Sequence, residues 1–380
     1  MEIKLMIESI GLSEWILLGL FISTLLVQCF YYLGIYIRLP RHKQDKRKNS
    51  SKGISIVICA RNEAKNLENF LPRILEQVYP KFEVVVVNDC STDHTEELLS
   101  EMKVRYGHLR YTNIPLNEKF THGKKLALTV GLKSAQYDHV LLTDADCYPA
   151  DKLWLQFMAG KLGGGKEIVL GYGSYERRKG LLNLLIRYET VFTAIQYLSF
   201  ALKGKPYMGV GRNLAYRKDL FFKNKGFAGH YHIASGDDDL FVNQHSIKEN
   251  TSIEIEAESH TISIPKEGFG AWVRQKRRHL LAGKLYNRAS RFRLGLELIS
   301  RMLLYASFIS LMLISNLHVP LAIIFGLFVI IRMSIFKMGM SRLNEKYLLL
   351  PSLLLDLVLP LILGAIWISN LFVTKNQSWS

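Results

Sequence analysis

Long apolar segments stand near both ends of this 380-residue chain and enclose a polar middle part. The first covers residues 15–37 and contains no charged residue. Because about 20 helical residues cross the hydrocarbon core of a membrane, this segment is long enough to span it. A cleaved signal peptide would begin with basic residues and have a shorter apolar run, whereas here acidic residues precede the segment and basic residues follow it. We therefore predict a membrane anchor at residues 15–37.

The C-terminal third contains three further apolar segments. Residues 302–315 and 321–336 flank a short turn, and a third segment runs from about residue 348 to residue 373. This third segment contains two prolines, which membrane helices tolerate, and Asp356 as its one acid. We predict one N-terminal transmembrane helix and about three C-terminal ones, the latter within residues 299–373.

Basic residues give the expected orientation of these helices. The formal net charge is +16, and lysine and arginine dominate residues 38–52 and the loop between the last two apolar segments. Loops of this kind stay on the cytoplasmic side of a membrane. We therefore predict a multi-pass protein of the cell (inner) membrane, with residues 1–14 and the tail 374–380 outside and the basic linker 38–52 inside. Since the basic excess lies beside apolar segments, it indicates an anionic membrane surface as partner and not nucleic acid.

The pattern of residues 53–268 predicts a cytoplasmic α/β domain. Residues 53–60 form an apolar strand candidate followed by a helical pattern, and residues 82–87 begin a second such unit. A repeated order of strand, polar loop and helix is typical of parallel βαβ units. In such sheets ligands bind at the carboxyl ends of the strands. Acidic residues fall at those ends, namely Glu63, Asp89, Asp144 and Asp146.

The acids that follow the strand candidate at residues 139–143 are the strongest sign of a functional site. Asp144 and Asp146 are spaced one residue apart, so both can face the same side of an extended chain. Carboxylates are costly to bury without a cation, and hard oxygen ligands of this kind suit Mg²⁺ or Mn²⁺ that carries phosphate groups. A solvated acidic turn is the alternative, as is a plain turn at Asp89.

Three other features place charge near this expected site. Gly123 and Lys124 open a helix, where the lysine suits a phosphate, although an exposed basic turn has the same pattern. Residues 237–239 are three aspartates, whose mutual repulsion raises the proton affinity of at least one of them, as suits a general base. The alternative is that these acids complement the dipole at the start of a helix, which would give the same sequence pattern. Residues 269–298 are basic and amphipathic, which predicts interfacial helices in the headgroup zone.

Two segments of the middle part have patterns that other structures could share. Residues 181–202 are nearly all apolar, but Arg187 and Glu189 make a membrane span expensive, so we predict a helix packed against the domain or lying at the lipid interface. Residues 208–217 predict a glycine-rich turn that leads into a strand and lets a ligand approach the backbone. The four cysteines lack paired metal-ligand spacing, so we expect reduced thiols and no zinc site.

Taken in order, these motifs resemble those of membrane-bound family 2 glycosyltransferases, which are inverting enzymes of the GT-A fold. The resemblance covers about residues 54–280 and implies a mixed, mainly parallel sheet flanked by helices. It also implies roles for particular residues. The nucleotide would be held by Ala60, Arg61, Glu63 and Asp89, with Gly123 and Lys124 in the same donor pocket. The metal would be bound by Asp146, the more direct ligand, and by Asp144. The catalytic base would be Asp238, with Asp237 as the next choice.

A further motif of the resemblance lies in the basic segment. Gln275, Arg278 and His279 resemble the Gln-x-x-Arg-Trp motif of polysaccharide synthases and related glycolipid transferases, which implies catalytic roles for Gln275 and Arg278. His279 stands in place of the tryptophan. This departure weakens the expectation of an aromatic platform for an acceptor sugar, and with it the expectation of processive synthesis.

The resemblance implies a metal-dependent, inverting sugar transfer at the cytoplasmic membrane face. The donor would be a nucleotide sugar, with a UDP-sugar favoured, and the acceptor a lipid-linked or growing glycan. A processive polysaccharide synthase is the alternative within the same chemistry. A nucleotidyltransferase on a related fold and a non-catalytic membrane scaffold or transporter are alternatives from other classes.

Overall fold

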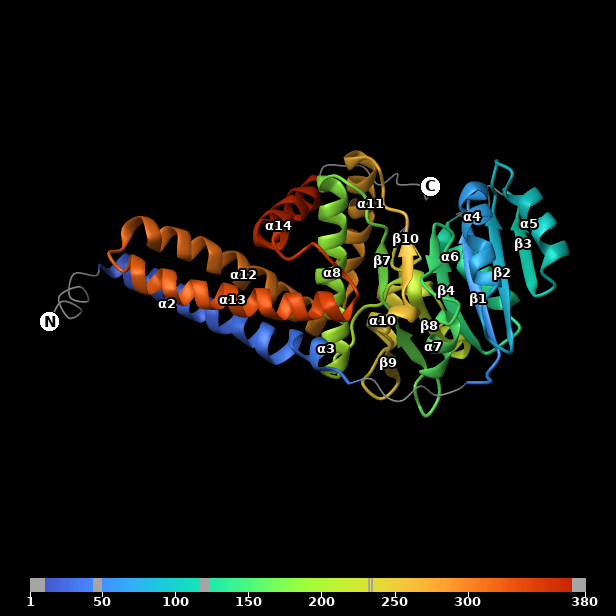
Figure 1. Ribbon diagram of the computed structural model, residues 1–380, viewed down its shortest axis with the longest axis horizontal. Helices are drawn as coiled ribbons and strands as arrows, with labels where there is room; N and C mark the ends of the chain where they lie inside the picture. Colours follow the sequence, from blue (N-terminus) through green and yellow to red (C-terminus); the bar gives the residue numbers. More distant parts are fainter. Residues whose placement is uncertain (1–10, 44–49, 117–122, 232, 234, 371–380) are drawn as a thin grey trace.

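The computed structural model describes residues 11–43, 50–116, 123–231, 233 and 235–370. It shows an α/β domain joined to an elongated group of helices that contains both apolar ends of the chain (Figure 1). Parts of the predicted outer segment 1–14, of the linker 38–52 and of the last apolar segment, and all of the tail 374–380, lie outside the described residues.

The main sheet of the α/β domain has seven strands and is mixed but mainly parallel. Strand β8 runs antiparallel to both of its neighbours, β4 and β6, whereas the other neighbouring pairs are parallel. This confirms the expected sheet. Its strands lie in the order β3 (Leu109–Ile114), β2 (Phe82–Asp89), β1 (Ile54–Ala60), β4 (His139–Asp144), β8 (Leu214–Arg217), β6 (Ile168–Leu170) and β9 (Thr251–Ile253).

The pairing register brings three strand ends to one edge of this sheet. Ala60 of β1 lies opposite Asn88 of β2, and Cys59 lies opposite Asp144 of β4. The polar loops that follow β1, β2 and β4 therefore emerge side by side. A second sheet of three short strands continues from the loop after β4, in the order β5 (Cys147–Pro149), β10 (Thr261–Ser263) and β7 (Gly173–Tyr175).

Helices cover both faces of the main sheet because successive strand residues face opposite sides. Ile54, Ile56 and Ile58 of β1 belong to one core cluster, together with buried side chains of α4 (Ala64–Leu75), α5 (Thr95–Arg105) and α7 (Trp154–Gly160). Val57 faces the other side, where it belongs to the core cluster that includes α6.

Helix α6 (Lys124–Ser134) lies unusually close to the sheet at Gly131, and a Cβ atom there would stand 2.5 Å from Cγ1 of Val57. We expect Gly131→Ala to lower the free energy of unfolding by about 1–2 kcal/mol, because overpacking a buried contact outweighs the better helix propensity of alanine. Thermal unfolding in detergent measures this. In Gly295→Ala of α12 (Arg288–Ile314) the new methyl group meets nothing within 4 Å, so this control should not be destabilised.

Helix α8 (Leu181–Leu202) packs between the α/β domain and the membrane-type helices, as we expected of residues 181–202 (Figure 1). Its Arg187 is buried and forms an ion pair with Glu345, which also accepts a hydrogen bond from the hydroxyl of Tyr172 at 3.0 Å. The basic helix α11 (Phe269–Ala282) lies beside α8. The short helices α9 (Lys218–Lys223) and α10 (Asp239–His245) complete the domain.

Among the described residues, four helical segments are long and apolar enough to cross a membrane, one N-terminal and three C-terminal as expected. The first extends over Leu12–Arg41 and comprises α2 (Leu12–Cys29), a π-helical stretch (Phe30–Tyr36) and α3 (Arg38–Arg41). The others are α12, α13 (His318–Arg342) and α14 (Pro351–Ser369). Helix α12 begins earlier than the predicted boundary at residue 299, because the side chain of Asn287 caps it by accepting a hydrogen bond from Ser290 N at 2.8 Å.

A buried polar cluster ties these apolar helices together. Asp356 of α14 accepts hydrogen bonds from Nη1 of Arg301 at 2.8 Å and from the hydroxyls of Tyr188 and Tyr305 at 2.9 and 2.6 Å. Nη1 of Arg332 lies 2.9 Å from its second oxygen. The sequence showed Asp356 as an isolated acid, but its cationic partners come from α12 and α13.

Candidate active site

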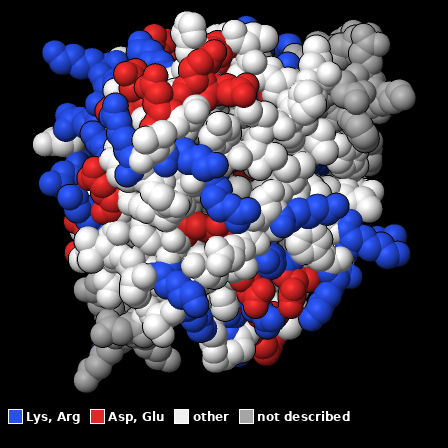
Figure 2. Space-filling view, turned by 90° about the vertical axis from the view of Figure 1, so that its right-hand side faces the viewer, with Lys and Arg blue, Asp and Glu red and all other residues white. Residues whose placement is uncertain are grey.

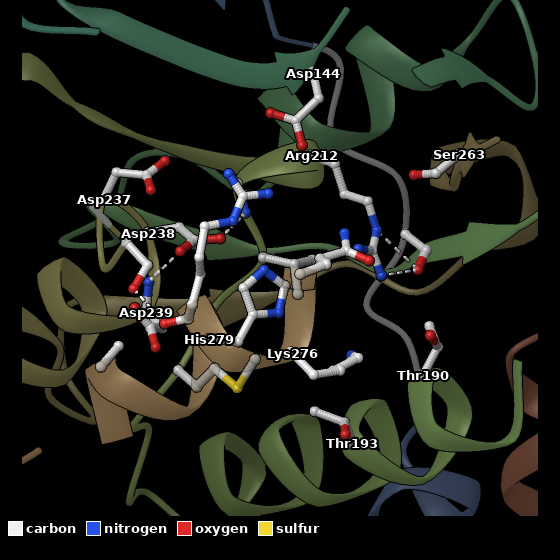
Figure 3. Close-up of a pocket in the computed structure, with 18 of the residues that line it drawn as sticks. Asp144, Thr190, Thr193, Arg212, Asp237, Asp238, Asp239, Ser263, Lys276 and His279 are labelled. Carbon is white, nitrogen blue, oxygen red and sulfur yellow. Dashed lines mark hydrogen bonds between the residues drawn. The ribbon is translucent and has the colours of Figure 1, made fainter. Parts of the chain in front are cut away.

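A pocket of about 460 Å³ lies between the carboxyl ends of the main strands, helix α8 and helix α11 (Figure 3). Segments that are far apart in the sequence line it. Of the residues expected to act, the structure brings together here Glu63, Lys124, Asp144, Asp146, Asp237, Asp238, Gln275 and Arg278.

Lys124 connects two of the acidic loops. It is the first residue of α6, and its Nζ lies 2.8 Å from Oδ1 of Asp144 and 3.1 Å from Oδ2 of Asp237. Burial alone would lower the pKa of this lysine, but the surrounding aspartates raise it well above its ordinary value. Lys124 therefore stays charged and fixes the loop after β4 against the segment that precedes α10.

Asp144, Asp146 and Cys147 place possible ligand atoms within 4.8 Å of one another. Burial and the neighbouring Asp144 raise the pKa of Asp146, and a cation would relieve this repulsion. Burial raises the pKa of the Cys147 thiol well above its usual value, and the thiol lies 2.9 Å from the hydroxyl of Ser263. The available ligands are therefore carboxylate oxygens, which fit Mg²⁺ or Mn²⁺ and not a thiolate-bound metal.

The three consecutive aspartates have different partners. Asp237 is buried and paired with Lys124. Asp238 caps α10 and accepts hydrogen bonds from the backbone N–H groups of Asp239 and Gly211, while Oδ2 of Asp239 accepts one from the hydroxyl of Tyr286 at 2.8 Å. Burial, followed by repulsion between neighbouring carboxylates, raises the pKa of Asp238 to about 6 and that of Asp239 to about 7.

The glycine-rich turn at residues 209–213 forms another wall, as expected of a turn that approaches a ligand. Arg212 donates hydrogen bonds to the carbonyl of Gly173 and lies 4.8 Å from the ring centre of Tyr175. The next residue, Asn213, is fully buried and accepts a hydrogen bond from the indole of Trp154 at 3.0 Å. This anchored neighbour holds the Arg212 guanidinium in the pocket wall.

Helix α11 closes the pocket on the side of the membrane-type helices. The carbonyl of Arg278 accepts a hydrogen bond from the Ser235 hydroxyl at 2.7 Å, which ties α11 to the segment that carries the aspartates. Nζ of Lys276 lies 2.7 Å from Oε2 of Glu189 on α8. His279 stands in the middle of the pocket, and burial together with the nearby cations lowers its pKa well below its usual value (Figure 3). It is therefore a neutral imidazole at neutral pH.

Four of the expected nucleotide residues do not line this pocket, namely Ala60, Arg61, Asp89 and Gly123. Asp89 is buried at the end of β2, and β1 lies between β2 and the acids that follow β4. Hydrogen bonds join the loops after β1 and β2: the backbone N–H of Asn62 donates to the Ser91 hydroxyl at 2.8 Å, and its side chain accepts from Thr92 N at 2.8 Å. Asp89 therefore lies beside the pocket and not within its wall.

The sequence did not assign roles to several residues that line the pocket. These are Glu189, Arg212, Lys266, Lys276 and Tyr286. Arg212 had a signal, because it follows the glycines of the predicted turn. Glu189 had none, since its place in the wall depends on how α8 packs.

The basic segment lies on the side of the domain that faces the apolar helices. Arg288 and Arg291 are exposed at the start of α12, beside the exposed ring of Phe292. The opposite pole of the domain carries basic and acidic side chains intermixed (Figure 2). The charge distribution therefore fits a membrane surface on the side of the helices.

Comparisons with known proteins find similarity in the sequence and in the fold. Residues 55–223 match the sequence model described as glycosyl transferase family 2. The poly-β-1,6-N-acetyl-D-glucosamine synthase of Staphylococcus aureus (strain COL) is 32% identical over 118 residues, 31% of this chain and 27% of that protein. The Staphylococcus epidermidis synthase is 33% identical over 95 residues, 25% of this chain and 22% of that protein. The chain thus matches about a quarter of the length of these curated relatives.

A solved structure extends the similarity to nearly the whole chain. The mannosyltransferase PcManGT from Pyrobaculum calidifontis, in complex with GDP-Man and Mn²⁺, superposes with a TM-score of 0.62 and covers 95% of this chain and 99% of that one. At 18% sequence identity this similarity shows a shared fold.

The fold is of the GT-A type, and the domain that has it is joined to helices long and apolar enough to cross a membrane. The part of the chain at residues 55–223 is a family 2 glycosyltransferase domain. The resemblance noted in the motifs is thereby confirmed. This similarity favours an enzyme over a non-catalytic scaffold or transporter.

Proposed function

We propose that the protein transfers a sugar, with inversion, from a nucleotide sugar to a lipid-linked or glycan acceptor at the cytoplasmic face of the membrane. One observation carries this proposal: acids from the loops after β1 and β4 and from the segment before α10 line one pocket with Lys124, Arg212 and Arg278. Such a pocket can hold an anionic leaving group at one end and deprotonate a hydroxyl at the other.

The division of roles follows from the contacts. Lys124 already pairs with Asp237, so Asp238 and Asp239 remain as acceptors for a proton. We assign the base to Asp238, held by the N–H groups of Gly211 and Asp239. Arg278 and Gln275 from α11 face the departing diphosphate. Ala60, Arg61 and Asp89 contact the nucleotide from the adjoining strand ends, and Gly123 contacts it from the start of α6.

The oxygens of Asp144 and Asp146 would hold Mg²⁺ or Mn²⁺. When bound, the ion would supply positive charge for the diphosphate. The shared fold with PcManGT, whose complex contains GDP-Man and Mn²⁺, supports a divalent ion and a nucleotide-sugar donor. Among such donors we favour a UDP-sugar.

The raised pKa values predict the pH dependence. A carboxylate accepts a proton only when ionised, so transfer should fall as the pH drops through the range between about 7 and about 6, where Asp239 and Asp238 become protonated. Below that range kcat/KM should fall about tenfold per pH unit. Tyr286→Phe removes a hydrogen bond that lowers the pKa of Asp239, so Asp239 should become protonated at higher pH, whereas the fall in rate near pH 6, which Asp238 sets, should stay in place. A flat profile between pH 5 and 8 would contradict this assignment.

A screen of nucleotide sugars tests the proposal. The purified protein in lipid nanodiscs is supplied with membrane lipid extract as acceptor and with Mn²⁺, and released nucleoside diphosphate is scored. We expect turnover with one donor class and loss of turnover with EDTA. Failure of every donor, with the protein folded and lipid present, would overturn the proposal.

A processive synthase remains the second candidate because the Staphylococcus relatives are polymer synthases. Product length separates the two. His279, in place of a tryptophan, leads us to expect a single addition.

A further inference from the structure

We propose that α14 does not cross the membrane, and that it is embedded in the leaflet on the side of the catalytic domain, where it forms the lipid-facing wall of the active-site pocket. The other three apolar segments run side by side away from the domain, whereas α14 contacts them around Asp356 and otherwise lies beside α8 and α11 (Figure 1).

The contacts of the three bundle helices define which of their ends lies at the catalytic domain. For the first segment it is the C-terminal end, where Tyr36 accepts a hydrogen bond from Gln196 of α8 at 3.2 Å. For α12 it is the N-terminal end, where Asn287 N donates to the Asn243 side chain at 2.8 Å. For α13 it is the C-terminal end, where Arg342 lies 3.4 Å from Glu256. The turn between α12 and α13 is therefore at the far side.

Helix α14 meets the domain side at both of its ends. It starts shortly after the domain end of α13, since Glu345 in the connecting loop pairs with Arg187 of α8. At its other end the Ser369 hydroxyl accepts a hydrogen bond from Nη2 of Arg277 at 3.2 Å, and the Asn370 amide donates to the Arg277 carbonyl at 3.3 Å. A helix of 19 residues is about 28 Å long. A crossing would carry Ser369 that far from α11, so these contacts exclude a crossing in this arrangement.

The side chains of α14 indicate lipid as its partner. Leu353, Leu354, Leu361, Trp367 and Ile368 are exposed, and Asp356, its one ionisable residue, is satisfied by the arginines of α12 and α13. Near the C-terminal end, Nζ of Lys284 lies 5.3 Å from the ring centre of Trp367. Tryptophan beside basic side chains is typical of the headgroup level of a membrane. The helix thus rises from the acyl region to the surface of one leaflet.

The same helix contributes to the pocket. Leu363 lines it, while Leu361 on the same helix is exposed to the surroundings. This arrangement lets an acceptor with a lipid tail reach the pocket along α14 without leaving the leaflet, an inference that rests on the proposed function.

Cysteine labelling tests the topology without any assay of activity. Single cysteines are introduced in the full chain by Lys346→Cys, by Asn316→Cys and by appending one after Ser380, and an impermeant maleimide is applied to right-side-out and inside-out vesicles. Labelling is measured separately for each cysteine-containing peptide, so the native cysteines need not be replaced. We expect the appended cysteine to label from the same side as Lys346→Cys and opposite to Asn316→Cys. Labelling of the appended cysteine together with Asn316→Cys would overturn the proposal.

A second measurement tests the pocket wall. Leu363→Trp should raise KM for a lipid-linked acceptor at least tenfold relative to Leu361→Trp, the matched control on the lipid side. Equal effects of the two variants would refute the role of α14 in the wall. If the protein transfers no sugar at all, this measurement fails with the proposed function, but the labelling result stands independently.

Discussion

Asp146→Asn should reduce sugar transfer by about 10³-fold and leave the protein folded, because the variant loses one of two carboxylates that fit the divalent ion beside the leaving diphosphate. The burial of Asp146 and its repulsion from Asp144 make the native charge costly without a cation. The neutral variant should therefore melt no lower than the wild type in the absence of metal. Initial rates at saturating donor and acceptor measure the loss.

The matched control for this variant is Asp138→Asn. Asp138 is an exposed aspartate that precedes β4, at the opposite end of the strand from Asp146. The control changes the same charge by the same chemistry and should keep its rate within about twofold of the wild type, as surface substitutions usually do. Equal rates of Asp146→Asn and the wild type would show that Asp146 has no role in sugar transfer.

Asp356→Leu should cause the largest loss of stability, about 3–5 kcal/mol, because it leaves Arg301 and Arg332 buried without their shared carboxylate. The loss is measured as the shift in apparent melting temperature in detergent. We expect recovery when Arg301→Met, Arg332→Met and Glu297→Gln are added, since Glu297 is a buried partner of Arg301 and would otherwise be stranded. If Asp356→Leu alone melts like the wild type, the cluster does not hold α14 in place.

The sequence predicted the α/β domain well because its signals are local. Residues 53–60 and 82–87 are mainly apolar and are interrupted by the polar side chains of Ser55 and Glu83, a pattern that suits parallel strands buried on both faces. Parallel pairing then brings the loops after β1, β2 and β4 to one edge without further information. The acids at Asp144 and Asp146 could be located for the same reason.

Other features depend on packing between distant segments and left no local signal. Glu189 reaches the pocket because α8 lies against α11, where Lys276 pairs with it. The two arginine partners of Asp356 stand 55 and 24 residues before it in the chain, on two other helices. Apolar length alone also made α14 look like the other spans, since length and composition do not record which elements its two ends contact.

The most direct test of the central claim, that one pocket separates donor binding from proton removal, is the affinity for the nucleoside diphosphate of the active donor. Titration calorimetry with and without Mn²⁺ is applied to the wild type, Asp146→Asn and Asp238→Asn. We expect Mn²⁺-dependent binding in the wild type and in Asp238→Asn, although the latter has lost transfer, and weak binding in Asp146→Asn with or without Mn²⁺. Mn²⁺-dependent binding of wild-type strength in Asp146→Asn, or transfer retained by Asp238→Asn, would contradict the account.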